Sequence, residues 1–101
     1  MDEKRKFFRL KNHGEILAKS SEQSLEVVEI SSSGALVIKK NINLSQTGTI
    51  EIIINNFDML IHYQILRTDE ETMVLIFKKE FEINKLFRAL KNLRDEQRKL
   101  N

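Results

Sequence analysis

The sequence of 101 residues contains no cysteine. This absence excludes a disulfide scaffold, a thiolate nucleophile and zinc or iron held by sulfur. Long apolar runs are also missing: the longest uncharged stretch, residues 41–50, has ten polar-rich residues, whereas a membrane-spanning helix needs about 20 apolar ones. His13 and His62 lie far apart and form no metal-binding motif. We therefore expect no membrane insertion, no metal site, no resident cofactor and no enzymatic activity.

The composition indicates one ordinary globular domain over residues 1–101. Hydrophobic residues make up 41% of the chain, which is close to the roughly 45 to 50% found in globular proteins once glycine is included. A chain of this length commonly forms a single domain. The charged residues 1–6 lead into no apolar segment of signal-peptide length, so the expected compartment is the cytoplasm.

Charge is distributed unevenly along the chain. Residues 1–11 carry five basic and two acidic side chains, a net +3; residues 12–79 carry six and nine, a net −3; residues 80–101 carry six and four, a net +2. A basic N-terminal arm, residues 1–11, therefore precedes an acidic body. Such an arm is either a solvated tail or a clamp for an anionic ligand, and the charge alone leaves both interpretations open.

Between residues 15 and 79, short β-branched runs with a period near two are separated by polar turns, which predicts antiparallel strands. The expected strands are Glu15–Lys19, Leu25–Ile30, Ala35–Lys39, Thr49–Ile54, Met59–Arg67 and Thr72–Phe77. Hairpin turns are expected at residues 55–56 and 69–71. Because six short strands in a small domain need closure to protect their edges, we predict a mainly β fold, a small six-stranded antiparallel β-barrel.

After residue 80 the hydrophobic period becomes helical, which predicts a C-terminal α-helix over residues 81–100. One stripe of this helix holds Ile83, Leu86, Phe87, Leu90, Leu93 and Leu100. An isolated helix of this length is marginal in water, so the stripe needs an apolar partner. We favour the chain's own barrel over a second copy, and expect a monomer or a weak homodimer.

Two short motifs carry the functional prediction. Arg5 and Arg9 form an R-x-x-x-R pattern just before the first strand, and Glu29, Ser31 and Gly34 form an E-x-S-x-x-G pattern between the second and third strands. Each has an ordinary explanation when taken alone. The first belongs to a solvated tail, and the second is a polar hairpin turn in which the glycine supplies a positive φ.

In combination, the two motifs resemble the signature of PilZ domains, which is R-x-x-x-R before the first strand and D/N-x-S-x-x-G at the junction of the second and third. The similarity continues at residues 35–37, 64–67 and 73–77, and covers roughly residues 4–79. A terminal helix is a common appendage in that family. The resemblance implies a barrel that binds cyclic di-GMP on its outer surface and relays its presence to a partner protein. The residues implied in binding are Arg5, Arg9, Glu29, Ser31 and Gly34.

The chemistry of these residues suits such a ligand. Arginine forks onto guanine O6 and N7 or onto phosphate oxygens with two parallel donors, and lysine lacks that geometry. Ser31 would add a hydroxyl contact, and Gly34 would allow close approach of the backbone. Ordering the arm costs roughly 1 to 2 kcal/mol per residue, so we expect micromolar affinity.

Glu29 departs from the family pattern, because it stands where the family has Asp or Asn. Its carboxylate keeps the charge and the acceptors for guanine N–H groups, but it is one methylene longer and less able to form an Asx-type turn. An alternative function is therefore a nucleotide-independent adaptor of the same fold for pilus, flagellar or exopolysaccharide machinery. A third hypothesis, a barrel that binds single-stranded nucleic acid, is disfavoured because the acidic strand region offers only Phe57, Tyr63 and Phe77 as aromatic platforms.

Overall fold

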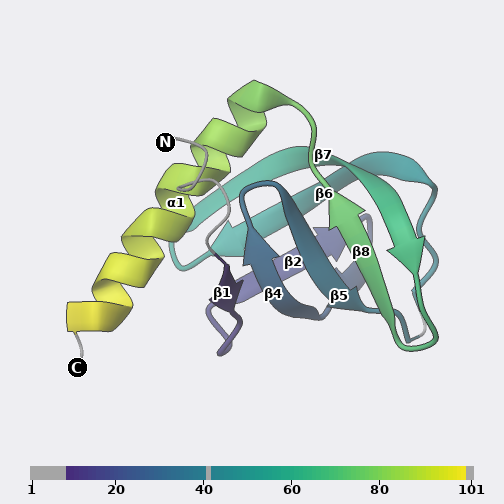
Figure 1. Cartoon of the computed structure of the whole chain (residues 1–101), viewed down its shortest axis with the longest axis horizontal. Helices are drawn as coiled ribbons and strands as arrows, with labels where there is room; N and C mark the ends of the chain where they lie inside the picture. Colours follow the sequence, from purple (N-terminus) through teal and green to yellow (C-terminus); the bar gives the residue numbers. More distant parts are fainter. Residues whose placement is uncertain (1–8, 41, 100–101) are drawn as a thin grey trace.

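The computed structural model describes residues 9–40 and 42–99, which form one curled antiparallel sheet and one helix (Figure 1). The strands are β1 (Leu10–Lys11), β2 (Ile16–Ser20), β3 (Gln23–Leu25), β4 (Val27–Ser31), β5 (Gly34–Ile38), β6 (Thr47–Ile54), β7 (Phe57–Thr68) and β8 (Thr72–Ile76), and the helix is α1 (Glu80–Lys99). The strand order across the sheet is β1-β4-β5-β8-β7-β6-β2-β3.

The predicted mainly β class with a C-terminal helix is confirmed, but the number of strands is eight rather than six, and the barrel is a curled sheet. One extra strand is the short β1, which pairs with β4. The other arises because the predicted strand Leu25–Ile30 is interrupted at Glu26. Leu25 pairs with Ala18 of β2, whereas Val27 pairs with Val37 of β5. The chain therefore passes from one end of the sheet to the other at Glu26, which curls the sheet into a half-barrel.

Asn12 joins the two ends of the curled sheet. Its side-chain amide donates hydrogen bonds to the carbonyl oxygens of Ile16 (2.9 Å) and Val27 (3.0 Å), and its Oδ1 accepts from the Ile16 N–H (3.1 Å). Its own backbone N–H donates to the Val28 carbonyl at 3.0 Å. One side chain thus ties the start of β2 to β4, and residues 10–12 lie against the strand that carries the second motif.

The longest hairpin follows the predicted alternation. β6 and β7 pair in continuous register from Thr47 and Gln64 to Ile54 and Phe57, and Asn55 has a positive φ of 54° in the expected turn. The second predicted hairpin loop, residues 69–71, joins β7 to β8. The inward side chains of the hairpin form much of the core; they are Ile50, Ile52, Ile54, Met59, Ile61 and Tyr63.

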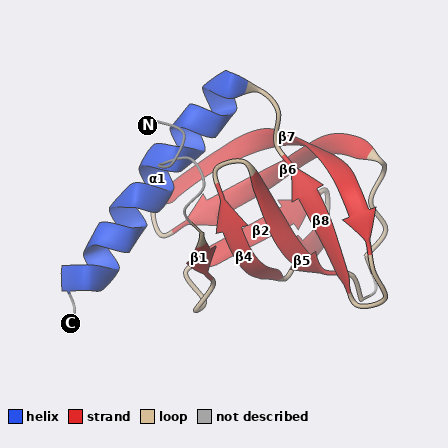
Figure 2. Ribbon diagram, viewed as in Figure 1, coloured by secondary structure: helices blue, strands red, loops and turns tan. Residues whose placement is uncertain are grey.

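α1 packs on its own sheet, as expected (Figure 2). Leu86, Leu90 and Leu93 are buried in the same core as the inward strand residues, and Ile83 packs against that core. Leu100, the last residue of the predicted stripe, lies outside the described residues. The described part of the stripe is therefore covered by the chain's own sheet, which supplies the apolar partner that the helix requires.

Two β-bulges determine which side chains reach the outer face of the sheet. The register between β4 and β5 shifts between Val27 and Glu29, and that between β7 and β8 shifts between Ile65 and Arg67. Strict alternation from the buried Val27 would turn Glu29 inward, and alternation from Tyr63 would do the same to Arg67. The extra residue at each bulge places Glu29 and Arg67 on the outer face instead.

Candidate functional site on the outer face of the sheet

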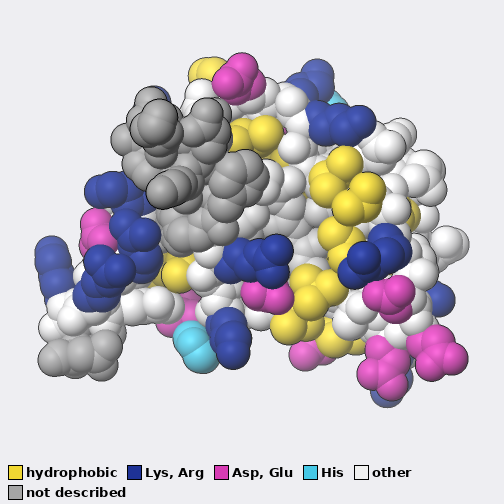
Figure 3. Space-filling view, in the orientation of Figure 1, with side chains coloured by type: hydrophobic (Ala, Val, Ile, Leu, Met, Phe, Trp, Pro, Cys, Tyr) yellow, Lys and Arg dark blue, Asp and Glu magenta, His cyan; other side chains and the backbone are white. Residues whose placement is uncertain are grey.

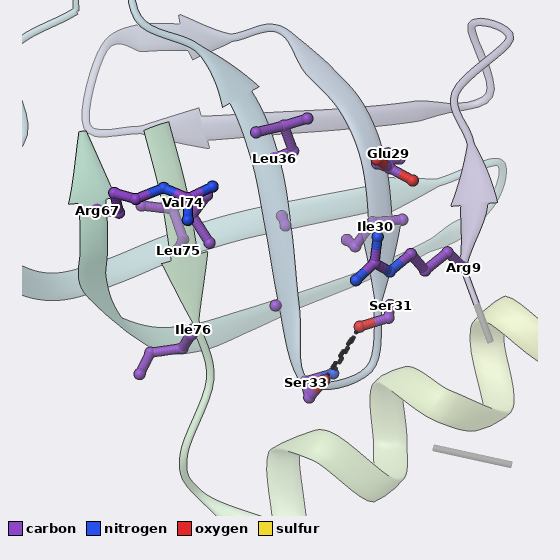
Figure 4. A pocket seen from close by; sticks show the side chains of 12 residues that line it. Arg9, Glu29, Ile30, Ser31, Ser33, Leu36, Arg67, Val74, Leu75 and Ile76 are labelled. Carbon is purple, nitrogen blue, oxygen red and sulfur yellow. Dashed lines mark hydrogen bonds between the residues drawn. The ribbon is translucent and has the colours of Figure 1, made fainter. Parts of the chain in front are cut away.

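A shallow cavity of about 460 Å³ lies on the outer face of the sheet, over β4, β5 and β8 and between Arg9 and Arg67 (Figure 4). Its size falls within the range of small-molecule sites, roughly 300 to 1,000 Å³. The remaining lining residues are Glu29, Ile30, Ser31, Ser33, Gly34, Ala35, Leu36, Val74, Leu75 and Ile76.

Strand register explains why side chains from distant parts of the sequence meet here. Glu29 on β4 pairs with Leu36 on β5, which pairs with Val74 on β8, which pairs with Arg67 on β7. These four residues form one row across the outer face. The row begins with a carboxylate, ends with a guanidinium, and has two partly buried aliphatic side chains between them.

Arg9 is the residue just before β1, and its side chain lines the cavity. Leu10 is buried and pairs with Ile30 of β4, and Lys11 pairs with Glu29. Continuing this register places Arg9 beside Ser31 on the outer face. In Figure 4 the Arg9 side chain extends across β4 toward β5, and Arg67 extends toward it from β7 across β8. Arg5, the other arginine of the first motif, lies outside the described residues.

The serine turn between β4 and β5 is held by its own hydrogen bonds. The Ser31 Oγ accepts a hydrogen bond from the Ser33 N–H at 3.2 Å and lies 3.1 Å from the Ser33 Oγ. The Ser33 carbonyl accepts from the Phe77 N–H at 2.9 Å, which fixes the turn to the end of β8. Ser32 is buried, with 2% of its surface exposed. Ser31 therefore holds the turn as well as lining the cavity.

Gly34 is needed for a reason other than the predicted one. The expectation that it supplies a positive φ is wrong, because among the described glycines only Gly14 has one, at 106°. Gly34 is instead the first residue of β5, paired with Ser31 on one side and Ile76 on the other. A Cβ atom at Gly34 would lie 2.5 Å from the Leu75 carbonyl oxygen. Glycine thus permits the close approach of β5 and β8 under the site.

Glu29 is partly exposed on the outer face, and within residues 9–40 and 42–99 its carboxylate has no hydrogen bond or ion pair. Four of the five predicted site residues, Arg9, Glu29, Ser31 and Gly34, line the same cavity.

Sequence reasoning missed Arg67 and the apolar floor of the cavity. The floor is formed by Leu36, Val74 and Ile76, all partly buried. Figure 3 shows hydrophobic side chains in a stripe over β5 and β8, with Lys or Arg side chains on both sides. The sequence of residues 64–67 gave no indication that Arg67 faces outward. Its orientation results from the bulge at Leu66, which reverses the alternation of side chains along β7.

Other kinds of site are not found in the described part of the chain. Residues 9–40 and 42–99 contain no group of three or more His, Cys, Asp or Glu side chains that could hold a metal ion. In the same residues, no helix is both long and apolar enough to cross a membrane.

Several solved structures are similar to this chain, and two of them are described below. A crystal structure of an uncharacterized Legionella protein, Lpg0364, is 48% identical to this chain, with a TM-score of 0.88, and the match covers 91% of this chain and 99% of that one. The Bacillus subtilis inhibitor of motility, MotI (DgrA), is 13% identical with a TM-score of 0.55, and the match covers 86% of this chain and 49% of MotI. This second likeness shows the fold alone.

Comparison with curated protein sequences found no significant match. A family model described as PilZ domain-like matches residues 9–98, which include nearly all of the sheet and helix described above. The chain therefore belongs to the PilZ-like family.

Proposed function

We propose that this chain is a receptor domain for cyclic di-GMP that relays the presence of the nucleotide to a protein partner. One observation carries the proposal: Arg9, Glu29, Ser31 and Gly34, which come from both motifs, line a single cavity on the outer face of the sheet. A cluster of these residue types in one shallow cavity is suited to an anionic ligand with flat, hydrogen-bonding bases.

Each residue has a distinct role in this proposal. Arg9 forks onto a guanine edge or a phosphate of the ligand, since its guanidinium presents parallel donors. Glu29 accepts hydrogen bonds from guanine N–H groups, and its extra methylene is accommodated because the bulge at Val28 turns it outward. Ser31 offers its hydroxyl from the edge of the turn. Arg5 acts from the N-terminal arm, and the affinity is micromolar.

Binding is tested by isothermal titration of the full chain with cyclic di-GMP at tens of micromolar protein. We expect heat of binding for the wild type and a loss of affinity of about tenfold or more for Arg9→Ala, corresponding to one bidentate contact. Arg5→Ala should also weaken binding. Arg88→Ala is the matched control, because it removes the same charge from α1, away from the cavity. Absence of heat with the wild type, or unchanged affinity in Arg9→Ala, refutes the proposal.

A second candidate is an adaptor of the same fold that binds no nucleotide. It is favoured by Glu29, which stands where the second motif of nucleotide-binding relatives has Asp or Asn. This candidate predicts no heat with cyclic di-GMP, no gain from Glu29→Asp, and a protein partner in pull-downs that is indifferent to the nucleotide.

The partner we propose for either candidate belongs to bacterial motility or exopolysaccharide machinery in the cytoplasm. PilZ-fold domains act by binding rather than by catalysis, and a protein named as an inhibitor of motility shares this fold. Pull-downs with and without cyclic di-GMP distinguish a regulated partner from a constitutive one.

A further inference from the structure

We infer that Arg67 is a further ligand-binding arginine, at the end of the cavity opposite Arg9, and that it makes the site select a nucleotide with two guanine units over one with a single unit. This inference rests on the proposed function. It extends the site beyond the two sequence motifs to a residue on β7.

The placement of Arg67 supports a ligand that lies across the sheet. Arg9 precedes β1 and Arg67 is on β7, with β4, β5 and β8 between them in the strand order. Neighbouring strands lie about 4.8 Å apart, so roughly 19 Å of sheet separates the two backbones. The two arginine side chains extend toward each other over the outer face of the sheet (Figure 4). A ligand held by both must cover β4, β5 and β8, whereas a mononucleotide held at one end covers only part of the cavity.

The floor between the two arginines suits the flat faces of bases. Leu36 and Val74 occupy the middle of the row that joins Glu29 to Arg67, and Ile76 lies next to it on β8. These aliphatic side chains are partly exposed and form a continuous apolar stripe. A base lying on this stripe would keep its hydrogen-bonding edge toward the arginine at its own end of the cavity.

The two ends of the cavity differ in charge. At the β4 end, Arg9 lies near Glu29 and Ser31, which together offer donors and acceptors. At the β7 end, Arg67 is the charged residue of the lining. Its Nε lies 3.6 Å from the Asp69 carboxylate, and both side chains are more than half exposed. An exposed pair of this kind is weak in water, so Asp69 orients Arg67 without removing it from the reach of a ligand.

The experiment is a titration of the full chain with two probes, cyclic di-GMP and cyclic GMP, followed by amide chemical shifts. We expect Arg67→Ala to weaken binding of cyclic di-GMP by about tenfold or more, as for the loss of one bidentate contact. Binding of cyclic GMP, which occupies the Arg9 end, should stay unchanged. Arg67→Lys should not restore the affinity, because lysine lacks the fork. Arg88→Ala should match the wild type with both probes.

The amide shifts give a second readout. Cyclic di-GMP should shift the signals of Leu36, Val74 and Ile76 in the wild type, and in Arg67→Ala the shifts should contract to the Ser31–Gly34 turn. Equal affinity of Arg67→Ala and wild type for cyclic di-GMP, with Arg9→Ala still impaired, overturns this inference and leaves the proposed function standing. An equal loss for both probes also overturns it. A wild type that binds no cyclic di-GMP removes both.

Discussion

The Glu82 carboxylate on α1 accepts a hydrogen bond from the backbone N–H of His62 on β7 at 3.0 Å, and its second oxygen lies 2.8 Å from the His62 Nδ1. β8 pairs with β7 only from Gln64 onward, so none of the described strands pairs with this side of β7 at His62. Glu82 supplies the missing acceptor. Toward the other end of α1, the Gln97 side-chain amide donates to Glu15 at 3.1 Å. The helix is thus tied to the sheet near both ends.

Replacing Glu82 with alanine should loosen the docking of the helix. We expect a loss of roughly 1 to 2 kcal/mol, since hydrogen bonds to a charged group contribute about 1.5 to 3 kcal/mol and part of this one is solvent-screened. For a domain of this size the melting temperature should fall by roughly 5 to 10 °C. Thermal unfolding, monitored by circular dichroism, measures this change in melting temperature. The control is Glu96→Ala, on an exposed position of the same helix; equal effects of the two variants would contradict a specific role for Glu82.

Lowering the pH should weaken the interaction between Glu82 and His62. Burial by itself would raise the pKa of Glu82, but the hydrogen bonds from the His62 backbone and side chain, with the charges of His62 and Lys79, outweigh it and hold the pKa below the usual 4.5. A carboxyl group with a lowered pKa in the folded state stabilises the protein above its unfolded pKa, and this contribution is lost as the pH falls through the folded value. Stability should therefore decrease below about pH 4.5. Urea unfolding at pH 7 and pH 3.5 should show a smaller decrease for Glu82→Gln than for the wild type; identical decreases would contradict this account.

A methyl group at Gly34 should separate β5 from β8. Gly34→Ala places a Cβ atom 2.5 Å from the backbone carbonyl oxygen of Leu75, which cannot move without disturbing the pairing of the two strands. We expect a destabilisation of about 1 to 3 kcal/mol. Gly48→Ala is the comparison, because its added Cβ would meet the Tyr63 side chain at 3.1 Å rather than backbone. Thermal unfolding should rank Gly34→Ala as the more damaging change, and the reverse order would refute the explanation.

The helix should contribute to the core through its buried stripe. Leu90 is fully buried, whereas Phe81 is 80% exposed. We expect Leu90→Ala to cost about 2 to 5 kcal/mol, as for other buried leucines, and Phe81→Ala to change stability by no more than about 0.5 kcal/mol. Urea denaturation of both variants gives the comparison. Similar small losses in the two would show that α1 is not part of the cooperative unit.

The strongest local patterns predicted the structure well. The alternation of residues 49–54 and 59–67 gave the correct faces for β6 and the first part of β7, because this hairpin pairs without a bulge as far as Gln64. The helical stripe was correct as far as Leu93, because its period depends only on neighbouring turns. The interruption at Glu26 and the two-residue β1 were not predicted, since both depend on which distant strand accepts the pairing.

The amino-acid sequence alone determined the mainly β class, the terminal helix and the order of two motifs, since periodicity and residue spacing are local properties of the chain. Tertiary structure decided which of those residues share a surface. The bulges at Val28 and Leu66 turn Glu29 and Arg67 to the outer face, and the tight contact of β5 with β8 explains Gly34. The physical reason is that a bulge, or a close approach of two strands, depends on the register between them. Strands that are distant in the sequence have no defined register until they pair in the folded protein.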